Sequence, residues 1–227
     1  SKIYKFFIPQ EALDEGLDPQ IKTLFLQKLD QLRALGHTVE IKSLPMLKAS
    51  LAIYYTLMPS EVSTNLSRFD GIRFWQQGNT HDYPSLDQYY STMRAKGFGE
   101  EAKRRILLGT YILSSANYES YYLKALQAQK QLKSDFEDLF NNYDAVLTPT
   151  SPEVARKIWE KSDDPLKSYL ADLYTVPANL AGLPAISVPM WTISHQEEEL
   201  PTGLQIIWPM RSDQTVLNMA QLIEKLS

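Results

Sequence analysis

The chain has 227 residues, of which 44% are hydrophobic and 22% charged, a balance typical of a globular protein. Its net charge of -4 argues against a main nucleic-acid-binding surface, and the absence of cysteine excludes disulfides, thiolate metal sites and a cysteine nucleophile. No apolar run of about 18 residues and no signal peptide occurs, so we expect a cytoplasmic protein without a membrane partner.

The first part of the chain has the pattern of a strand, a helix and a second strand. Residues 2–8 are mostly apolar, which suits a strand. Asp18-Pro19 is a strong helix start, apolar residues then recur at helical spacing, and Gly36 marks the end. Residues 38–42 alternate as a strand does. A strand–helix–strand unit with short connections predicts parallel strands joined by a right-handed crossover, and therefore an α/β fold.

Most of the middle of the chain has helical periodicity. We expect helices over residues 46–69, 86–94, 98–115 and 118–140, the first of them kinked or broken at Pro59. The last helix carries a stripe that we expect to lie in the core. The stripe consists of Tyr118, Tyr121, Tyr122, Ala125, Leu132, Phe136, Leu139 and Phe140.

Arg105 is the most informative residue of these helices. Stepping about 100° per residue places it in the middle of the predicted inward side, whereas Arg104 points elsewhere. The other members of that side are Phe98, Ala102, Gly109, Ile112 and Leu113. A buried charge without a partner costs several kcal/mol, roughly, so Arg105 must meet a carboxylate or line a wet pocket. The spacing leaves open a structural ion pair, a snorkelling side chain and a binding role.

The C-terminal part returns to strands. Residues 144–147 and 204–208 are short apolar runs that predict strands, and residues 185–188 have the pattern of a strand buried on both faces. Residues 154–170 are polar and predict a surface excursion. Asp213 is a candidate cap for a last helix.

The stretch 172–189 packs a turn, a short helix and a strand into eighteen residues. Thr175 is a candidate N-cap, and Gly182 can adopt the left-handed conformation that closes a helix. Asp172 stands just ahead of this apolar segment. Its carboxylate is expected either at the solvated rim or against a cationic partner.

Other candidates for catalysis or metal binding are weak. His37, His81 and His195 are far apart and lack metal-ligand spacing, and Ser114-Ser115 suits helix capping better than nucleophilic attack. No glycine-rich phosphate loop, nucleophile elbow or paired-carboxylate signature occurs. The residues therefore indicate half of a site, with a cation and an acid but no activated nucleophile.

Five spaced motifs resemble the amidase signature family and follow one another in the family's order over nearly the whole chain. The block from Asn65 to Gly71 favours the branch formed by the A subunits of aspartyl/glutamyl-tRNA amidotransferases. The motifs are Tyr54-Tyr55, the segment 61–73, the segment 97–110, Tyr143–Pro152 and the segment 175–189. The chain departs from the family pattern at Trp75 and Trp208, where the family has glycine.

The resemblance implies a mixed β-sheet flanked by helices. The family's serine nucleophile, its bridging serine with a cis peptide bond and its lysine base lie in a glycine- and serine-rich segment that this chain does not contain. We therefore expect a single α/β domain over residues 1–227 that corresponds to the C-terminal portion of the family domain. It has no catalytic residues of its own and is predicted to be inactive alone.

The resemblance also implies a glutamine site. Asp172 and Arg105 match the positions that bind the ammonium and the carboxylate of glutamine, and Tyr54 matches a tyrosine of the same pocket. The implied function is glutamine hydrolysis that supplies ammonia for amidating glutamyl- or aspartyl-tRNA. Other amidotransferase subunits are the expected partners, with tRNA contacted only indirectly and ATP and Mg²⁺ held by a partner subunit.

Two alternatives stay open at this point. In the first alternative to the amidotransferase function, the chain is part of a general small-amide amidase. In the second, it is a folded interaction module without a substrate. Because a sheet without its remaining strands exposes edges, self-association is also expected.

Overall fold

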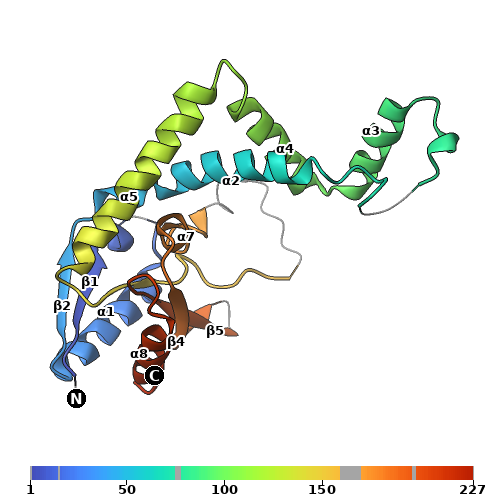
Figure 1. Ribbon diagram of the computed structural model, residues 1–227. Helices are drawn as coiled ribbons and strands as arrows, with labels where there is room; N and C mark the ends of the chain where they lie inside the picture. Colours follow the sequence, from blue (N-terminus) through green and yellow to red (C-terminus); the bar gives the residue numbers. More distant parts are fainter. Residues whose placement is uncertain (1, 15, 75–77, 159–169, 196–197, 227) are drawn as a thin grey trace. The chain divides into compact units, whose positions relative to one another are not determined.

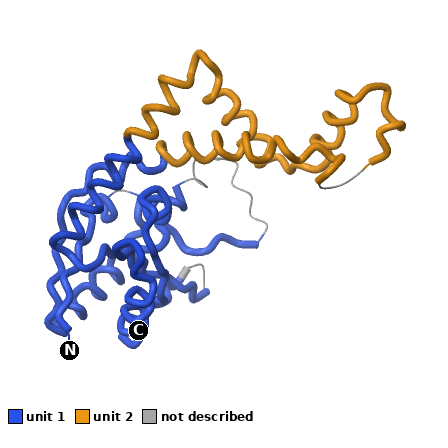
Figure 2. Tube along the Cα trace, in the orientation of Figure 1, with its two compact units in different colours: residues 1–51, 128–227 blue, residues 52–127 orange. Residues whose placement is uncertain are grey.

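The structure is a computed structural model that describes residues 2–14, 16–74, 78–158, 170–195 and 198–226. The chain divides into two compact units (Figure 2), unit 1 with residues 1–51 and 128–227 and unit 2 with residues 52–127. Unit 2 is therefore an insertion in the sequence of unit 1. The expectation of a single domain stays a prediction.

Unit 1 contains a mixed sheet of five described strands in the order β2-β1-β3-β5-β4 (Figure 1). The strands are β1 (Lys5–Pro9), β2 (Thr38–Lys42), β3 (Ala145–Pro149), β4 (Ala185–His195) and β5 (Glu198–Ile207). The helical segments are η1 (Gln10–Leu13), α1 (Pro19–Ala34), η2 (Pro45–Ala49), α7 (Val176–Ala181) and α8 (Asp213–Glu224), together with the larger part of α5 (Lys124–Phe140). The predicted α/β class with a mixed sheet and flanking helices is confirmed.

The strand–helix–strand order and the parallel pairing predicted for the first 42 residues are confirmed. β1 and β2 are parallel, with Lys5 opposite Thr38. The Asp18 carboxylate caps α1 by accepting hydrogen bonds from the N–H groups of Gln20 and Ile21, at 2.7 and 3.3 Å. Gly36 follows the helix with a φ of 89°, a left-handed conformation that favours glycine. Local signals at both ends of α1 therefore made the bounds of this helix predictable from the sequence.

The C-terminal strands form a long antiparallel hairpin that joins the sheet through β5. β3 is parallel to β1 and antiparallel to β5, and β5 pairs along its length with β4. A register shift between Pro189 and Thr192 is bridged by the Thr202 hydroxyl, which donates to the Trp191 carbonyl at 2.5 Å. The expectation that residues 185–188 are buried on both faces is wrong, because Ala185 and Ser187 are exposed.

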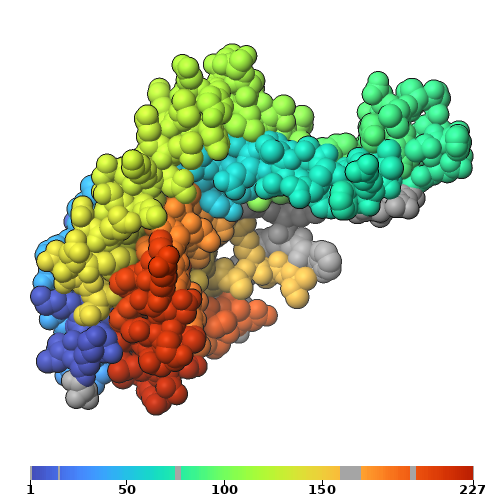
Figure 3. Space-filling model, in the orientation of Figure 1, coloured from blue at the N-terminus to red at the C-terminus, as the bar shows by residue number. Residues whose placement is uncertain are grey.

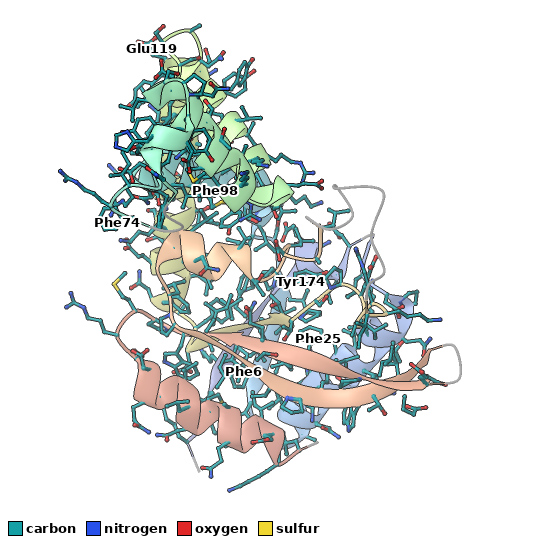
Figure 4. All side chains as sticks on the ribbon, turned by 90° about the vertical axis from the view of Figure 1, so that its right-hand side faces the viewer. Phe6, Phe25, Phe74, Phe98, Glu119 and Tyr174 are labelled. Carbon is teal, nitrogen blue, oxygen red and sulfur yellow. The ribbon has the colours of Figure 1, made fainter. Side chains whose placement is uncertain are left out.

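The core of unit 1 lies where β1, β3 and β5 meet the helices. Phe6 and Phe25 (Figure 4) are fully buried, and all residues of β3 are buried. α1 contacts β2, β3 and β4, and α8 contacts β4 and β5. α8 lies on the surface of the molecule (Figure 3), with Val216, Met219, Ala220 and Ile223 buried beneath it.

Trp208, one of the departures from the family pattern, is buried with its ring centroid 5.9 Å from that of Tyr4. Trp75 lies outside the described residues.

Protonation of His37 is expected to reduce the stability of unit 1 at acid pH. Its ring is buried, its Nδ1 accepts the Tyr4 N–H at 3.2 Å, and burial lowers its pKa. Protonation would desolvate a charge and convert the acceptor into a donor. The unfolded chain therefore binds this proton more readily. The contribution of His37 to stability is present above the ordinary histidine pKa and is lost as the pH falls from there through the lowered pKa of the folded state. Hydrogen exchange of the β1 and β2 amides should show lower protection at pH 5 than at pH 7.5. His37→Gln should reduce that difference; an unchanged difference would contradict the assignment.

Unit 2 is helical. Its elements are most of α2 (Ser50–Leu66), η3 (Thr80–Asp82), α3 (Leu86–Gly97), α4 (Glu100–Ile112), the π-helix η4 (Tyr118–Leu123) and the start of α5. Pro59 lies inside α2, which continues through it. None of the described helices of the chain is both long and apolar enough to cross a membrane.

α2 and α4 pack closely at Gly109. Gly109 is buried, and a Cβ at that position would overlap the backbone carbonyl of Pro59. Ile112, one turn further along, is buried as well. The inward side predicted from the spacing of α4 is thus the side that meets α2.

The predicted core stripe over residues 118–140 is only partly correct. Ala125, Leu132, Phe136 and Leu139 are buried, whereas Tyr118 and Tyr121 are exposed. The first six residues of the expected helix form the π-helix η4, whose wider turn changes the phase of the side chains. A single helical period therefore did not describe the whole segment.

Candidate functional site

Arg105 lies on the α2-facing side of α4 and is paired within its own helix. Its Nε donates to Oε1 of Glu101 at 2.8 Å, one turn earlier, and its side chain is 34% exposed. Nη1 lies 3.5 Å from the Met58 sulfur on α2. Of the alternatives left open by the sequence, the structure thus shows an ion pair, at a position that still reaches solvent.

The surroundings of Arg105 favour its charged form. Burial lowers its pKa, but the hydrogen bond to Glu101, the Glu101 charge and the phenols of Tyr54 and Tyr55 outweigh burial and raise the pKa above the ordinary arginine value. Tyr54 and Tyr55 pack edge to face, with ring centroids 5.2 Å apart. Tyr54 and Arg105 therefore share one environment in unit 2, and the guanidinium remains a permanent cation there.

Asp172 lies in unit 1, in the turn that leads into α7. The turn is closed by the Asp172 carbonyl, which accepts the N–H groups of Thr175 and Val176 at 3.2 and 3.1 Å. Thr175 takes the N-cap position, but its hydroxyl donates to the Asp172 carbonyl instead of capping α7. Gly182 closes α7 with a φ of 70°, as predicted. The side chain of Asp172 is carried by a short, hydrogen-bonded turn.

Beneath this turn, the sheet carries a polar stripe that the sequence analysis did not identify. Ser187 pairs with Gln205 and Gln205 with Thr148 across the antiparallel strands, so the three side chains share one face. The Gln205 amide donates to the Thr148 hydroxyl at 3.0 Å and to the Tyr174 carbonyl at 2.7 Å. A polar residue between Leu204 and Ile206, in the otherwise apolar run 204–208, was the available sign, because a buried amide requires partners.

The stripe continues to a pair of hydroxyls that meet across β5. Thr150 Oγ1 and Ser187 Oγ lie 2.7 Å apart, on opposite sides of Gly203. A Cβ at Gly203 would come within 2.7 Å of both oxygens, so only glycine leaves room for this contact. The face of the sheet next to the Asp172 turn is therefore lined by hydroxyl and amide groups.

The three predicted substrate-binding residues are divided between the two units. Tyr54 and Arg105 lie together in unit 2, and Asp172 lies in unit 1. Their role in binding stays a prediction. In the described part of the chain, no group of three or more His, Asp or Glu side chains could hold a metal ion.

Comparison with known proteins identifies the family. A family model described as Amidase matches residues 1–217. The chain is 45% identical to the A subunit of the glutamyl-tRNA(Gln) amidotransferase of Streptococcus pneumoniae over 97% of its own length and 44% of that protein. It is 43% identical to the second A subunit of the same type of enzyme from Clostridium acetobutylicum, over 97% of its own length and 45% of that protein. The chain thus spans less than half the length of these curated relatives.

The solved structures agree. The crystal structure of the A subunit of the glutamyl-tRNA(Gln) amidotransferase from Thermotoga maritima matches with a TM-score of 0.72 and 38% identity, over 99% of this chain and 42% of that one. A structure described as an amidase matches with the same TM-score of 0.72 at 19% identity, a likeness of fold alone. The resemblance noted from the five motifs is confirmed, and the chain belongs to the amidase family.

Proposed function

We propose that this chain is the glutamine-recognition part of the glutaminase subunit of a tRNA-dependent amidotransferase. The observation that carries the proposal is the 43–45% identity to the A subunits of amidotransferases over nearly the whole chain. That value is well above the 16–19% identity to structures that share only the fold. In the proposed reaction, glutamine is hydrolysed through an acyl-enzyme, and the ammonia is used by a partner subunit to amidate glutamyl- or aspartyl-tRNA.

The proposed recognition of glutamine uses one charge for each end of its amino-acid head. Asp172 binds the ammonium group and Arg105 the carboxylate, with Tyr54 beside Arg105. A guanidinium has five N–H donors, and the Nε donor of Arg105 is used by Glu101. The substrate carboxylate would then be held by the terminal nitrogens, while Glu101 fixes the orientation of the guanidinium plane.

The nucleophile is proposed to reside outside this chain, in the catalytic segment expected from the family resemblance. The partners proposed for the complete subunit are the other amidotransferase subunits, with ATP and Mg²⁺ on one of them and tRNA only in indirect contact. The proposed location is the cytoplasm, where aminoacylated tRNA is used.

The proposal predicts that the chain by itself does not hydrolyse glutamine, because positioned binding groups without a nucleophile leave the chemistry undone. Ammonia release from glutamine should stay at the buffer background for the chain and rise for the complete subunit. Tested against asparagine, propionamide and benzamide as well, the complete subunit should prefer the zwitterionic amino acids. Turnover by the chain alone would contradict the missing nucleophile, and a preference for the uncharged amides would favour a general amidase.

A further inference from the structure

We propose that Gln205 is a positioning residue for substrate binding, which holds the Asp172 turn in place through the backbone of Tyr174. The inference rests on the proposed function, because it assumes that Asp172 binds the ammonium group of glutamine. Gln205 does not touch the substrate in this proposal. It acts through the two-residue link between Tyr174 and Asp172.

The first part of the argument is that Gln205 is committed to this contact. Its side chain is on β5, the residue is 4% exposed, and its amide nitrogen donates to the Tyr174 carbonyl at 2.7 Å and to the Thr148 hydroxyl at 3.0 Å. A side-chain amide nitrogen has two hydrogens, so both donors are used. The donor to the Tyr174 carbonyl therefore stands on β5, which lies between β3 and β4 and pairs with both of them.

The second part is that Tyr174 is held at both ends. Its hydroxyl donates to the Ala12 carbonyl at 3.1 Å, the residue is 2% exposed, and burial raises the pKa of the phenol to about 12. Figure 4 shows Tyr174 with Phe6 and Phe25 in the part of the molecule that contains the sheet. With its carbonyl bound to Gln205 and its hydroxyl bound to Ala12, Tyr174 is a fixed point for the residues next to it.

The third part is that the turn passes this position on to Asp172. The Asp172 carbonyl accepts hydrogen bonds from the Thr175 N–H, the Val176 N–H and the Thr175 hydroxyl, at 3.1 to 3.2 Å. Tyr174 lies inside the loop that these bonds close. A change in the position of its carbonyl therefore moves the whole turn, including the backbone from which the Asp172 side chain projects. A displacement of about 1 Å is enough to weaken a charge-assisted contact to a substrate.

The test uses Gln205→Met in the complete subunit, with glutaminase kinetics. Methionine has a similar length and fills the site without an N–H donor, so the Tyr174 carbonyl loses its partner. We expect the KM for glutamine to rise about tenfold, with kcat within about threefold of the original, since a binding group is displaced and the nucleophile is not. In the double variant with Asp172→Asn, the second substitution should add little, because both act on the same contact.

Thr202→Val is the matched control. Thr202 is also a buried polar residue of β5 whose hydroxyl bonds the backbone, at Trp191, away from the Asp172 turn. The Thr202→Val variant should lower the melting temperature as Gln205→Met does, but it should leave the KM for glutamine within about twofold. A KM that rises equally in both variants would overturn the inference, because general loss of stability would then explain it.

The outcomes separate the two proposals. If Asp172→Asn leaves KM unchanged, the proposed role of Asp172 fails and the inference fails with it. If Asp172→Asn raises KM but a folded Gln205→Met does not, only the inference is overturned.

Should Gln205→Met not fold, Tyr174→Phe removes the other anchor of the same residue. A rise in KM of about threefold that is not additive with Asp172→Asn would then support the inference, and an unchanged KM would overturn it.

Discussion

Replacing Arg105 by alanine in the complete subunit should raise the KM for glutamine about 100-fold, because a charge-assisted pair with the substrate carboxylate contributes roughly 1.5–3 kcal/mol. The effect should fall on KM more than on kcat, since the contact exists before and during the reaction. Arg105→Lys should recover only part of the affinity, because an ammonium retains the charge but not the planar pair of donors. Steady-state glutaminase assays at saturating concentrations of the partner subunits would measure both constants.

Arg104→Ala provides the matched control. Arg104 precedes Arg105, forms an ion pair with the same Glu101, and has the more exposed side chain. If Arg105 only stabilises its helix, the two alanine variants should behave alike, since ion pairs this exposed contribute about 0–1 kcal/mol to stability. An unchanged KM in Arg105→Ala would return the residue to that structural role and remove the cation from the proposed site.

Gly109→Ala should destabilise unit 2 by about 2 kcal/mol or more. In an ordinary helix position, alanine would be favoured over glycine by about 1 kcal/mol. Here the added Cβ would overlap the Pro59 carbonyl, which belongs to the backbone of α2 and cannot rotate away as a side chain would. Either the two helices separate or α2 distorts, and both disrupt close packing. Arg105 and Tyr54, on the same two helices, would move with them.

Hydrogen exchange is the suitable measurement, because it resolves unit 2 from unit 1. Amides of α2 and α4 should lose protection in Gly109→Ala while those of β1 and β3 keep it. Gly99→Ala at the start of α4 is the control, because a Cβ there would meet no atom within 4 Å. Equal protection of α2 and α4 in both variants would contradict the close approach of these helices.

The parts of the fold that the sequence predicted are those with local signals. The first strand–helix–strand unit has a capping aspartate, a proline and a closing glycine, and each acts within one turn of the helix. The π-helix before α5 has no comparable signature, so a uniform period placed Tyr118 and Tyr121 in the core. The exposed face of β4 was missed for another reason, since an apolar run cannot reveal whether a neighbour covers its second face.

In the candidate site, too, the features with local signals were predictable and those that depend on distant residues were not. The wheel of α4 placed Arg105 on the correct side, and the Glu101 partner was also readable, as an acid four residues before an arginine. Gln205 was not recognised, because its partners lie 57 and 31 residues away in the chain. Contacts of that separation depend on the sheet order, which strand patterns do not specify.

The insertion of unit 2 sets the order in which unit 1 can be completed during synthesis. About 100 residues separate the end of β2 from the start of β3, which takes roughly 5–20 s at ribosomal speeds of about 5–20 residues per second. Throughout that interval, β1 lacks the neighbour that will cover its second edge. During synthesis, the β1–β2 pair therefore exposes an unpaired sheet edge until β3 emerges and covers it.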